Sequence, residues 1–236
     1  YTPDANYNGD DSFTFTVSDG TESSTETVTL TVSAVNDAPV LAAVSNVSFD
    51  EDGSGSTSLS GSDVDGDDLT YNITGGSDIT ASLSGSDVSF SAPADFNGSE
   101  SFTVSVTDGT ETDSQSITVT VNAVNDAPVA TAGLGGATDE DQSTVVTLSG
   151  SDVDGDNLTF SVGSATNGTL EISGSLVTYT PDANYNGLDS FDFTVSDGSE
   201  SSTETVTLTV SAVNDAPVLA AVSDVSFDED GSGSTS

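Results

Sequence analysis

An internal repeat of 89 residues is the feature that most limits the folds open to this chain. The residues Val-Asn-Asp-Ala-Pro return unchanged at 35–39, 124–128 and 213–217. Two acidic stretches recur on the same step: Asp-Glu-Asp at 50–52 and 139–141, and Ser-Asp-Val-Asp-Gly-Asp at 62–67 and 151–156. Each Val-Asn-Asp-Ala-Pro copy follows a strand-like run and stops at a proline, which cannot donate to a further β-ladder. We therefore interpret these five residues as a joint between domains.

The repeat predicts two complete domains between two partial ones. Residues 1–37 are the C-terminal part of one repeat, 38–126 and 127–215 are complete repeats, and 216–236 begin the next. Residues 1–58 match residues 179–236 at all but four places, an offset of two repeats, so two repeat types alternate. We call 38–126 the A repeat and 127–215 the B repeat. A unit of this size can close its own core, so we expect beads on a string and not a solenoid.

Alternating apolar and hydroxyl side chains predict half-buried antiparallel strands. Phe13, Phe15 and Val17 alternate with Thr and Ser, and no stretch shows the helical period of 3.6. This regularity argues against disorder, which the acidity would otherwise suggest. In the A repeat we expect seven strands near 44–49, 56–60, 69–74, 79–83, 88–92, 101–107 and 114–123. The predicted fold class is all-β: tandem seven-stranded antiparallel Greek-key β-sandwiches of the immunoglobulin-like kind.

The charge of the chain excludes several classes of function. There are 40 Asp and Glu and no Lys, Arg or His, which gives a formal charge of −40. Nucleic acid is therefore excluded as a partner, and metal ions or cations of the medium must neutralise the carboxylates. Without cysteine there is no disulfide or thiolate metal site. No apolar run approaches the roughly 18 residues of a membrane span, no signal peptide precedes Tyr1, and export signals could lie outside this window.

The order of the strands sorts the acidic loops between the two ends of each sandwich. Successive antiparallel strands reverse direction, so successive loops alternate between the poles. The loops at 50–52 and 95–98 then share the pole where the last strand leaves, which we call the exit pole. The loops at 63–67 and 108–109 lie at the other, the entrance pole, beside the preceding joint. Two carboxylates about 4 Å apart repel by roughly 4 kcal/mol at an effective dielectric near 20, so we expect a divalent cation at each joint.

Calcium is the ion that the sequence favours. It accepts six to eight hard oxygen ligands in flexible geometry, whereas magnesium demands a strict octahedron and zinc or copper favours His and Cys. An EF-hand does not fit, because the loop counted from Asp63 has Asp68 at position six and Thr74 at position twelve, where Gly and Glu are required.

The stretch Leu-Ser-Gly-Ser-Asp-Val-Asp-Gly-Asp-Asp-Leu-Thr-Tyr-Asn-Ile at 59–73, with Val-Thr-Asp-Gly at 106–109 and the joint, resembles a cadherin repeat. It is most similar to the cadherin-like tandem repeats of very long secreted bacterial surface proteins. The resemblance covers the whole chain and implies calcium bound between domains. The implied ligands at joint one are Asn36, Asp37, Asp63, Asp65 and Asp108. At joint two they are Glu51, Asn125, Asp126, Asp152, Asp154 and Asp197, and at joint three Glu140, Asn214 and Asp215.

The chain departs from the cadherin pattern in ways that imply fewer ions per joint than the cadherin three. An earlier joint Asp is replaced by Ala34, Ala123 and Ala212, and a second joint Asn by Ala38, Ala127 and Ala216. The cadherin glutamate motif between the fifth and sixth strands is absent. Only Asp11, Glu100 and Asp189, or the Asn of the Asn-Gly turns, could replace it. The aromatic residues before those turns, Tyr7, Phe96 and Tyr185, are expected to plug the core; a sugar-stacking platform is the alternative.

An enzyme is not expected. Two carboxylates suffice for glycoside hydrolysis, but a catalytic pair occupies one dedicated cleft, whereas these acids recur in every repeat. The predicted function is a calcium-rigidified spacer or stalk in the adhesion of a large extracellular bacterial surface protein. Its expected partners are calcium ions and neighbouring repeats of the same chain. Two alternatives remain: the array is itself the building block of a self-assembling extracellular fibre or coat layer, or it is a carbohydrate-binding module.

Overall fold

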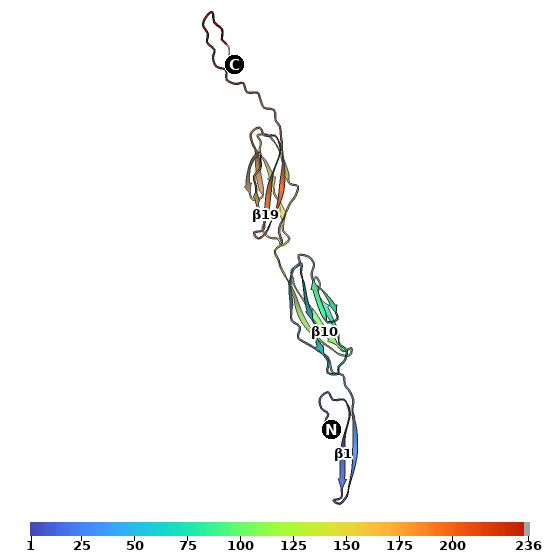
Figure 1. The fold of residues 1–236 in the computed structure, drawn as a ribbon. Coiled ribbons are helices and arrows are strands. Elements are labelled where there is room, and N and C mark those ends of the chain that lie inside the picture. Colours follow the sequence, from blue (N-terminus) through green and yellow to red (C-terminus); the bar gives the residue numbers. More distant parts are fainter. Residues whose placement is uncertain (234–236) are drawn as a thin grey trace. The chain divides into compact units, whose positions relative to one another are not determined.

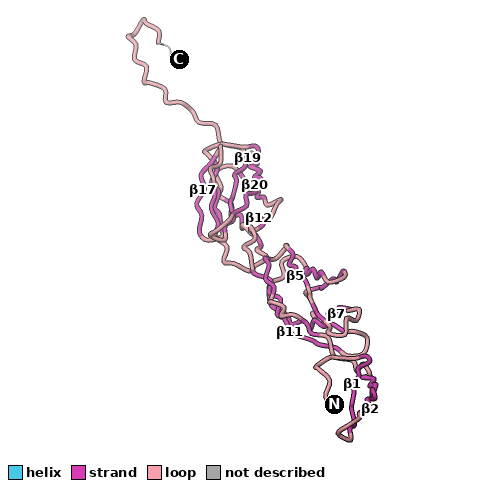
Figure 2. The backbone as a smooth tube through the Cα atoms, turned by 60° about the horizontal axis from the view of Figure 1, so that its bottom comes forward, coloured by secondary structure: helices cyan, strands magenta, loops and turns pink. Residues whose placement is uncertain are grey.

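A computed structural model of the chain describes residues 1–233, which form two compact units that divide between Val124 and Asn125 (Figure 1). All regular secondary structure in these residues is β-strand, and helices are absent from them (Figure 2). The predicted all-β class is therefore confirmed.

The A repeat is a sandwich of two sheets. One sheet has four strands in the order β4-β11-β10-β7, the other has three in the order β5-β9-β8, and β3 pairs with β6 beside them. The strands are β3 (Val40–Leu41), β4 (Val47–Asp50), β5 (Ser54–Ser58), β6 (Gly61–Ser62), β7 (Thr70–Gly75), β8 (Thr80–Ser84), β9 (Asp87–Ser91), β10 (Gly98–Thr107) and β11 (Thr112–Asn122).

Alternation along these strands separates a dry core from a hydroxyl-covered surface. In β10, Phe102, Val104 and Val106 are buried, whereas the Ser and Thr between them face outward. Phe90 of β9 meets Phe102 edge to face, with ring centroids 5.3 Å apart and planes at 69°, and this contact joins the two sheets. On the outer face, the hydroxyls of Ser99 and Thr120 lie 2.9 Å apart across the strand pair.

The B repeat has the same architecture in the second unit, with sheets ordered β13-β20-β19-β16 and β14-β18-β17 and a β12–β15 pair. Its strands are β12 (Val129–Ala130), β13 (Gly135–Asp139), β14 (Thr144–Thr147), β15 (Gly150–Ser151), β16 (Thr159–Val162), β17 (Gly168–Ser173), β18 (Leu176–Pro181), β19 (Gly187–Ser196) and β20 (Ser201–Ser211). Buried Tyr179 takes the place of Phe90, 89 residues earlier, and its hydroxyl donates to the Asp189 carboxylate at 2.9 Å.

The partial repeat at 1–37 contributes one hairpin to the first unit, formed by β1 (Gly9–Ser18) and β2 (Ser23–Val32). Phe13 and Phe15 are about half exposed there, because no second sheet covers them among the described residues. Their equivalents in the B repeat, Phe191 and Phe193, are buried.

The first strand of the A repeat differs from the single antiparallel strand expected at 44–49. It is split: β3 pairs antiparallel with β6, whereas β4 pairs parallel with β11. With seven alternating strands the first and last run in the same direction, so a pair between them must be parallel. The Gln115 side chain bridges the break by donating to the Leu41 and Ala42 carbonyls at 3.0 and 3.1 Å and accepting from the Val44 N–H at 3.1 Å.

Candidate metal centre

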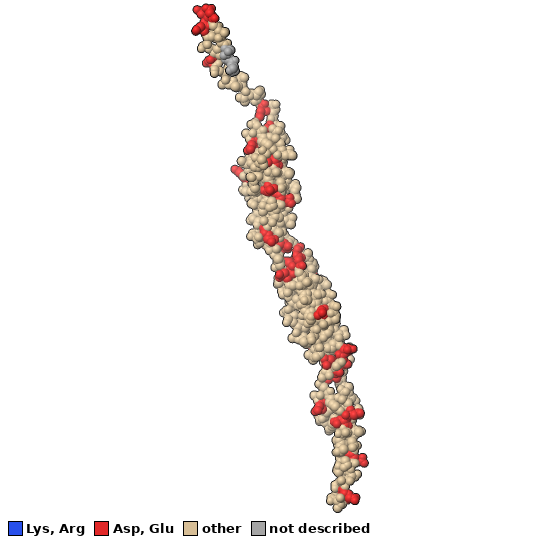
Figure 3. All heavy atoms as spheres, viewed as in Figure 1, with Lys and Arg blue, Asp and Glu red and all other residues tan. Residues whose placement is uncertain are grey.

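Acidic side chains lie mainly at the ends of the A sandwich. On the face drawn in Figure 3, red atoms gather at both ends of residues 38–124, and the flank between them is almost free of acid. Most positions of β10 and β11 are apolar or hydroxyl, so most carboxylates of the A repeat are left to the loops and joints.

The entrance loop of the A repeat follows β6 and folds around one aspartate. Asp63 accepts the N–H of Asp65 at 2.8 Å and that of Gly66 at 3.1 Å on the same oxygen, Oδ1. Gly66 has a φ of 82°, in the left-handed region that glycine adopts without strain. The loop thereby brings carboxylate oxygens of Asp63, Asp65 and Asp67 within 4.8 Å of one another. The other oxygen of Asp63, Oδ2, is buried and has no hydrogen-bond partner in the part of the chain that the structure describes.

The joint preceding the A repeat is bonded to this loop. The Asp37 N–H donates to Asp65 Oδ2 at 2.8 Å, and the Asn36 side-chain amide donates to Asp108 Oδ2 at 2.9 Å. The Asn36 amide and the N–H groups of Glu111 and Thr110 hold the pKa of Asp108 below its usual value. The structure thus gathers the five residues implied for joint one.

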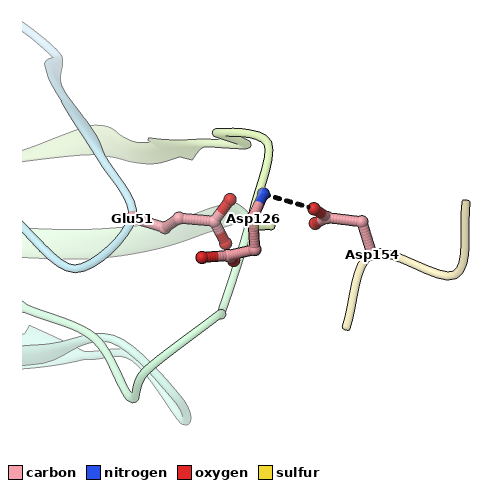
Figure 4. Close-up of side chains that lie close together, drawn as sticks. All are labelled: Glu51, Asp126 and Asp154. Carbon is pink, nitrogen blue, oxygen red and sulfur yellow. Dashed lines mark hydrogen bonds between the residues drawn. The ribbon is translucent and has the colours of Figure 1, made fainter. Parts of the chain in front are cut away.

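The second unit repeats this arrangement at the entrance of the B repeat. The Asp126 N–H donates to Asp154 Oδ2 at 2.8 Å, the bond drawn in Figure 4, and the Asn125 amide donates to Asp197 at 3.0 Å. Asp152 accepts the Asp156 N–H on Oδ1 at 3.2 Å, and its Oδ2 is buried without a hydrogen-bond partner among the described residues. Carboxylate oxygens of Asp152, Asp154 and Asp156 lie within 4.8 Å of one another. The Asn125 amide, with the Glu200 and Ser199 N–H groups, lowers the pKa of Asp197.

Each exit pole carries a buried glutamate directly after its strand. Glu51 follows β4 and is also drawn in Figure 4; Glu140 follows β13, and each is only 6% exposed. One oxygen of each accepts a backbone N–H from the start of the next joint, that of Val124 or Val213. The second oxygens differ: Glu51 Oε2 is buried without a partner in residues 1–233, whereas Glu140 Oε2 accepts the Asn186 amide at 3.4 Å.

The joint residues after the B repeat are placed in a similar way. The Asn214 amide donates to the Asp215 carbonyl at 3.1 Å, as the Asn36 amide does to Asp37 at 3.3 Å. Both residues are exposed. No entrance loop follows them within residues 216–233, so the ligand set implied for joint three is represented only by Glu140, Asn214 and Asp215.

These loops offer what a hard divalent cation requires. Every side chain in the two entrance clusters presents oxygen, and both clusters contain a buried carboxylate oxygen that receives no hydrogen bond from the described residues. Such an oxygen is costly to bury unless a positive group meets it. Calcium fits this donor set, because it accepts many carboxylate and carbonyl oxygens in flexible geometry.

Two carboxylates that the sequence left open as ligands have a different role. Glu100 accepts N–H groups from Ser77, Asp78 and Ile79 and the Ser77 hydroxyl. The Ser77 hydroxyl and the Asp78 N–H are the main causes that lower the pKa of Glu100 to about 2. Asp189 accepts the N–H groups of Thr166, Asn167 and Ser190 and the Tyr179 hydroxyl. Both side chains therefore fasten a loop of their own repeat.

Sequence reasoning placed the loops of Asp52 and Asp95 at the exit pole of the A repeat but did not count either residue as a ligand. Asp52 and Asp95 both have positive φ angles, 60° and 58°, and the Asp95 N–H donates to Asp52 Oδ1 at 3.4 Å. The 89-residue repeat contains a signal for these positions: Asp52 recurs as Asp141, and Asp95 corresponds to Asn184. Phe96 and Tyr185, which follow positions 95 and 184, pack against the cores, as expected for core plugs.

The fold and these clusters define a class of protein: tandem immunoglobulin-like β-sandwich repeats with acidic joints. The chain belongs to the bacterial Ig domain family, whose model matches residues 36–121 and 125–210. A cadherin-like domain model matches residues 1–33. The predicted resemblance to cadherin-like repeats of bacterial surface proteins is thereby confirmed.

Two solved protocadherin-24 fragments show the same fold. The EC1-2 fragment of human protocadherin-24, form II, is 18% identical with a TM-score of 0.52, over 76% of this chain and 100% of that one. Mouse protocadherin-24 EC1-3 is 16% identical with a TM-score of 0.51, over 89% of this chain and 81% of that one. An endo-fucoidan hydrolase of glycoside hydrolase family 107 is 23% identical with a TM-score of 0.34, and the match spans only 35% of that enzyme. A comparison with curated proteins found no match.

These relationships support coarse functional statements. Bacterial Ig and cadherin-like domains are typical of extracellular, adhesion-type structural proteins and are typically non-catalytic, and cadherin-like domains generally bind calcium. Within residues 1–233 we found no helix long and apolar enough to cross a membrane.

Proposed function

We propose that this chain is a calcium-stiffened spacer in a large extracellular bacterial surface protein, without catalytic activity of its own. In this role the repeats hold other parts of the protein away from the cell, and calcium ties each joint to the repeat that follows it. The proposal rests on the family, on the absence of any Lys, Arg or His, and on the geometry of the entrance loops.

The observation that carries the proposal is the buried, unpartnered Oδ2 of Asp63 and of Asp152. Each lies in a loop whose second aspartate, Asp65 or Asp154, already accepts a backbone N–H from the joint. The side chains expected to hold the ion are therefore already attached to the joint. Bound calcium would supply the positive charge that the loop carboxylates lack and would restrict rotation of the joint.

The ligand sets stay predictions. At the A entrance they comprise Asn36, Asp37, Asp63, Asp65 and Asp108, and at the B entrance Asn125, Asp126, Asp152, Asp154 and Asp197. We expect the exit glutamates Glu51 and Glu140 to add a carboxylate from the preceding repeat. The repetition of these acids in every repeat favours a structural role over a catalytic one.

The test is small-angle scattering and thermal melting of residues 1–236 in calcium, in chelator, and in magnesium at equal ionic strength. We expect calcium to lengthen the particle and raise its melting temperature, since an ion bound only to the folded form stabilises it by mass action. Magnesium should do less, because it demands stricter geometry. Equal dimensions and melting temperatures in all three buffers would contradict the proposal.

One observation favours a second candidate, an extracellular fibre built from the arrays themselves. The outer face of β10 and β11 carries Ser and Thr with few acids, so two copies could approach there with little repulsion. Scattering at increasing protein concentration separates the candidates: isolated particles support the spacer, and ordered bundles in calcium support the fibre.

A further inference from the structure

Asp108 and Asp197 receive hydrogen bonds on both carboxylate oxygens. Oδ1 of Asp108 accepts two N–H groups of its own turn, at 2.6 and 2.7 Å, and Oδ2 accepts the Asn36 side-chain amide at 2.9 Å. Asp197 repeats this pattern: Oδ1 accepts two N–H groups of its turn, and Oδ2 accepts the Asn125 amide at 3.0 Å. Each of these aspartates therefore connects a turn of the sandwich to the asparagine of the preceding joint.

The turn holds its aspartate in place without help from a joint. Asp19 occupies the same position in the partial first repeat, and no copy of the joint precedes it in the sequence. Its Oδ1 still accepts the N–H groups of Thr21 and Glu22, both at 2.9 Å. The Asp-Gly turn is thus a local structure that fixes one carboxylate oxygen and leaves the other for an asparagine of the joint.

The joint asparagine supplies what a second joint carboxylate could not. A carboxylate at position 36 would repel Asp108, whereas the Asn36 amide donates to it. The aspartate that follows in each joint is attached to the same repeat by a different group, its backbone N–H, which donates to the entrance loop at 2.8 Å in both repeats. Both polar residues of the joint are therefore bonded to the repeat that follows, and neither bond requires an ion.

We propose that Asp108 and Asp197 are positioning residues, each of which holds the joint asparagine on the following repeat before calcium binds. This inference rests on the proposed function, in which both residues belong to the ligand sets, and adds a role that does not need the ion. Calcium then meets a joint that is already ordered. An ordered joint favours binding, because less conformational freedom is lost when the ion arrives.

The test is nitrogen-15 relaxation of the full chain in chelator. A rigid backbone N–H has an order parameter of about 0.85, and a flexible one lies below about 0.6. We expect Asn36 and Asn125 to be near the rigid value. Asn214 serves as an internal reference, because its amide donates to the Asp215 carbonyl but to no carboxylate among the described residues, and we expect it to lie near the flexible value.

Two variants at joint two separate positioning from ligation. Asn125→Asp removes the donor and keeps an oxygen that could bind an ion, so residue 125 should become flexible in chelator while Asn36 stays rigid. Asp197→Asn should have the same effect on residue 125, because its side-chain oxygen can still accept the turn N–H groups but its amide cannot accept from Asn125. Asn214→Asp is the matched control and should leave the order parameters unchanged. Residues 125 and 214 are exposed, so both of their variants are expected to fold.

The outcomes distinguish this inference from the proposed function. If Asn36 and Asn125 are as flexible in chelator as Asn214, calcium alone orders the joints and the inference is wrong. If either variant leaves residue 125 rigid, the bond between the Asp126 N–H and Asp154 is sufficient and the inference is also wrong. If the joints are rigid in chelator but calcium changes neither the melting temperature nor the dimensions of the chain, the inference stands and the proposed function fails.

Discussion

Replacing Asp152 by Asn should change the stability of the second unit in opposite directions with and without calcium. Carboxylate oxygens of Asp152, Asp154 and Asp156 lie within 4.8 Å of one another. At that separation two charges repel by about 3 kcal/mol at an effective dielectric of 20, and by about 1 kcal/mol in bulk water. Because Asp154 and Asp156 are exposed, the lower figure applies. In chelator we therefore expect Asp152→Asn to stabilise the unit by about 1 kcal/mol.

In calcium the same substitution removes a charged ligand. An ion present at 1,000 times its Kd stabilises the folded state by about 4.1 kcal/mol. If the substitution raises Kd about a hundredfold, about 2.7 kcal/mol of that is lost, which exceeds the relief of repulsion. The variant should thus be less stable than the parent chain in calcium and more stable in chelator. Asn keeps the Oδ1 acceptor that receives the Asp156 N–H at 3.2 Å, so the loop itself is preserved.

The assay is urea denaturation of the full chain in both buffers, with hydrogen exchange of β19 and β20 to assign the transition to the second unit. Glu171→Gln, an exposed acid on β17, is the control and should behave alike in the two buffers. Loss of stability by a similar amount in chelator and in calcium would mean that Asp152 supports the fold and not an ion, and would refute this reasoning.

Three further substitutions test the roles assigned to residues inside the repeats. The pKa of Glu100 is lowered from 4.5 to about 2, chiefly by the Ser77 hydroxyl. The ionised Glu100 side chain therefore contributes stability above pH 4.5, and this contribution is lost as the pH falls toward 2. In Glu100→Gln, the urea midpoint should fall less steeply with pH between 4.5 and 2. Tyr179→Phe removes a donor to the Asp189 carboxylate and should lower the free energy of unfolding of the second unit by about 1.5–3 kcal/mol in urea titrations. Gly76→Ala forces a side chain onto a φ of 77° with its Cβ against the Ile79 carbonyl oxygen, and should cost at least about 1–3 kcal/mol, measured as a lower melting temperature; an unchanged value would contradict the close approach.

The sequence could predict the sandwich because its signals are local and repeated. Period-two alternation locates β10 and β11 to within a few residues, and the reversal of successive strands is enough to place Asp63 and Asp108 at the pole of the preceding joint. An odd number of strands also requires that a pair between the first and last be parallel, an inference that could have been drawn before the structure.

Other features depend on contacts that no local pattern reveals. The first strand is split, and Gln115, over 70 residues away, bonds the backbone at Leu41 and Val44 on the two sides of the break. Nothing in the spacing distinguishes Glu100, which binds its own loop, from a metal ligand at the same pole. Asp52 and Asp95 were placed at one pole but left out of the ligand sets, because both residues sit in turns, where Asp is common for conformational reasons alone.

These observations are linked by which carboxylate oxygens receive hydrogen bonds and which do not. A chain without Lys, Arg or His can satisfy a carboxylate held in the fold only with N–H groups and hydroxyls, and it does so at the partly buried Glu100 and the buried Asp189, each of which accepts four such bonds. The same fold could have supplied donors at the poles, yet Asp63 Oδ2, Asp152 Oδ2 and Glu51 Oε2 receive none from the described residues. Because an unmatched buried carboxylate oxygen is costly, the position of these oxygens at the poles supports the proposed cation there. General acidity alone would leave such oxygens exposed, as those of Asp87 on β9 and Glu171 on β17 are.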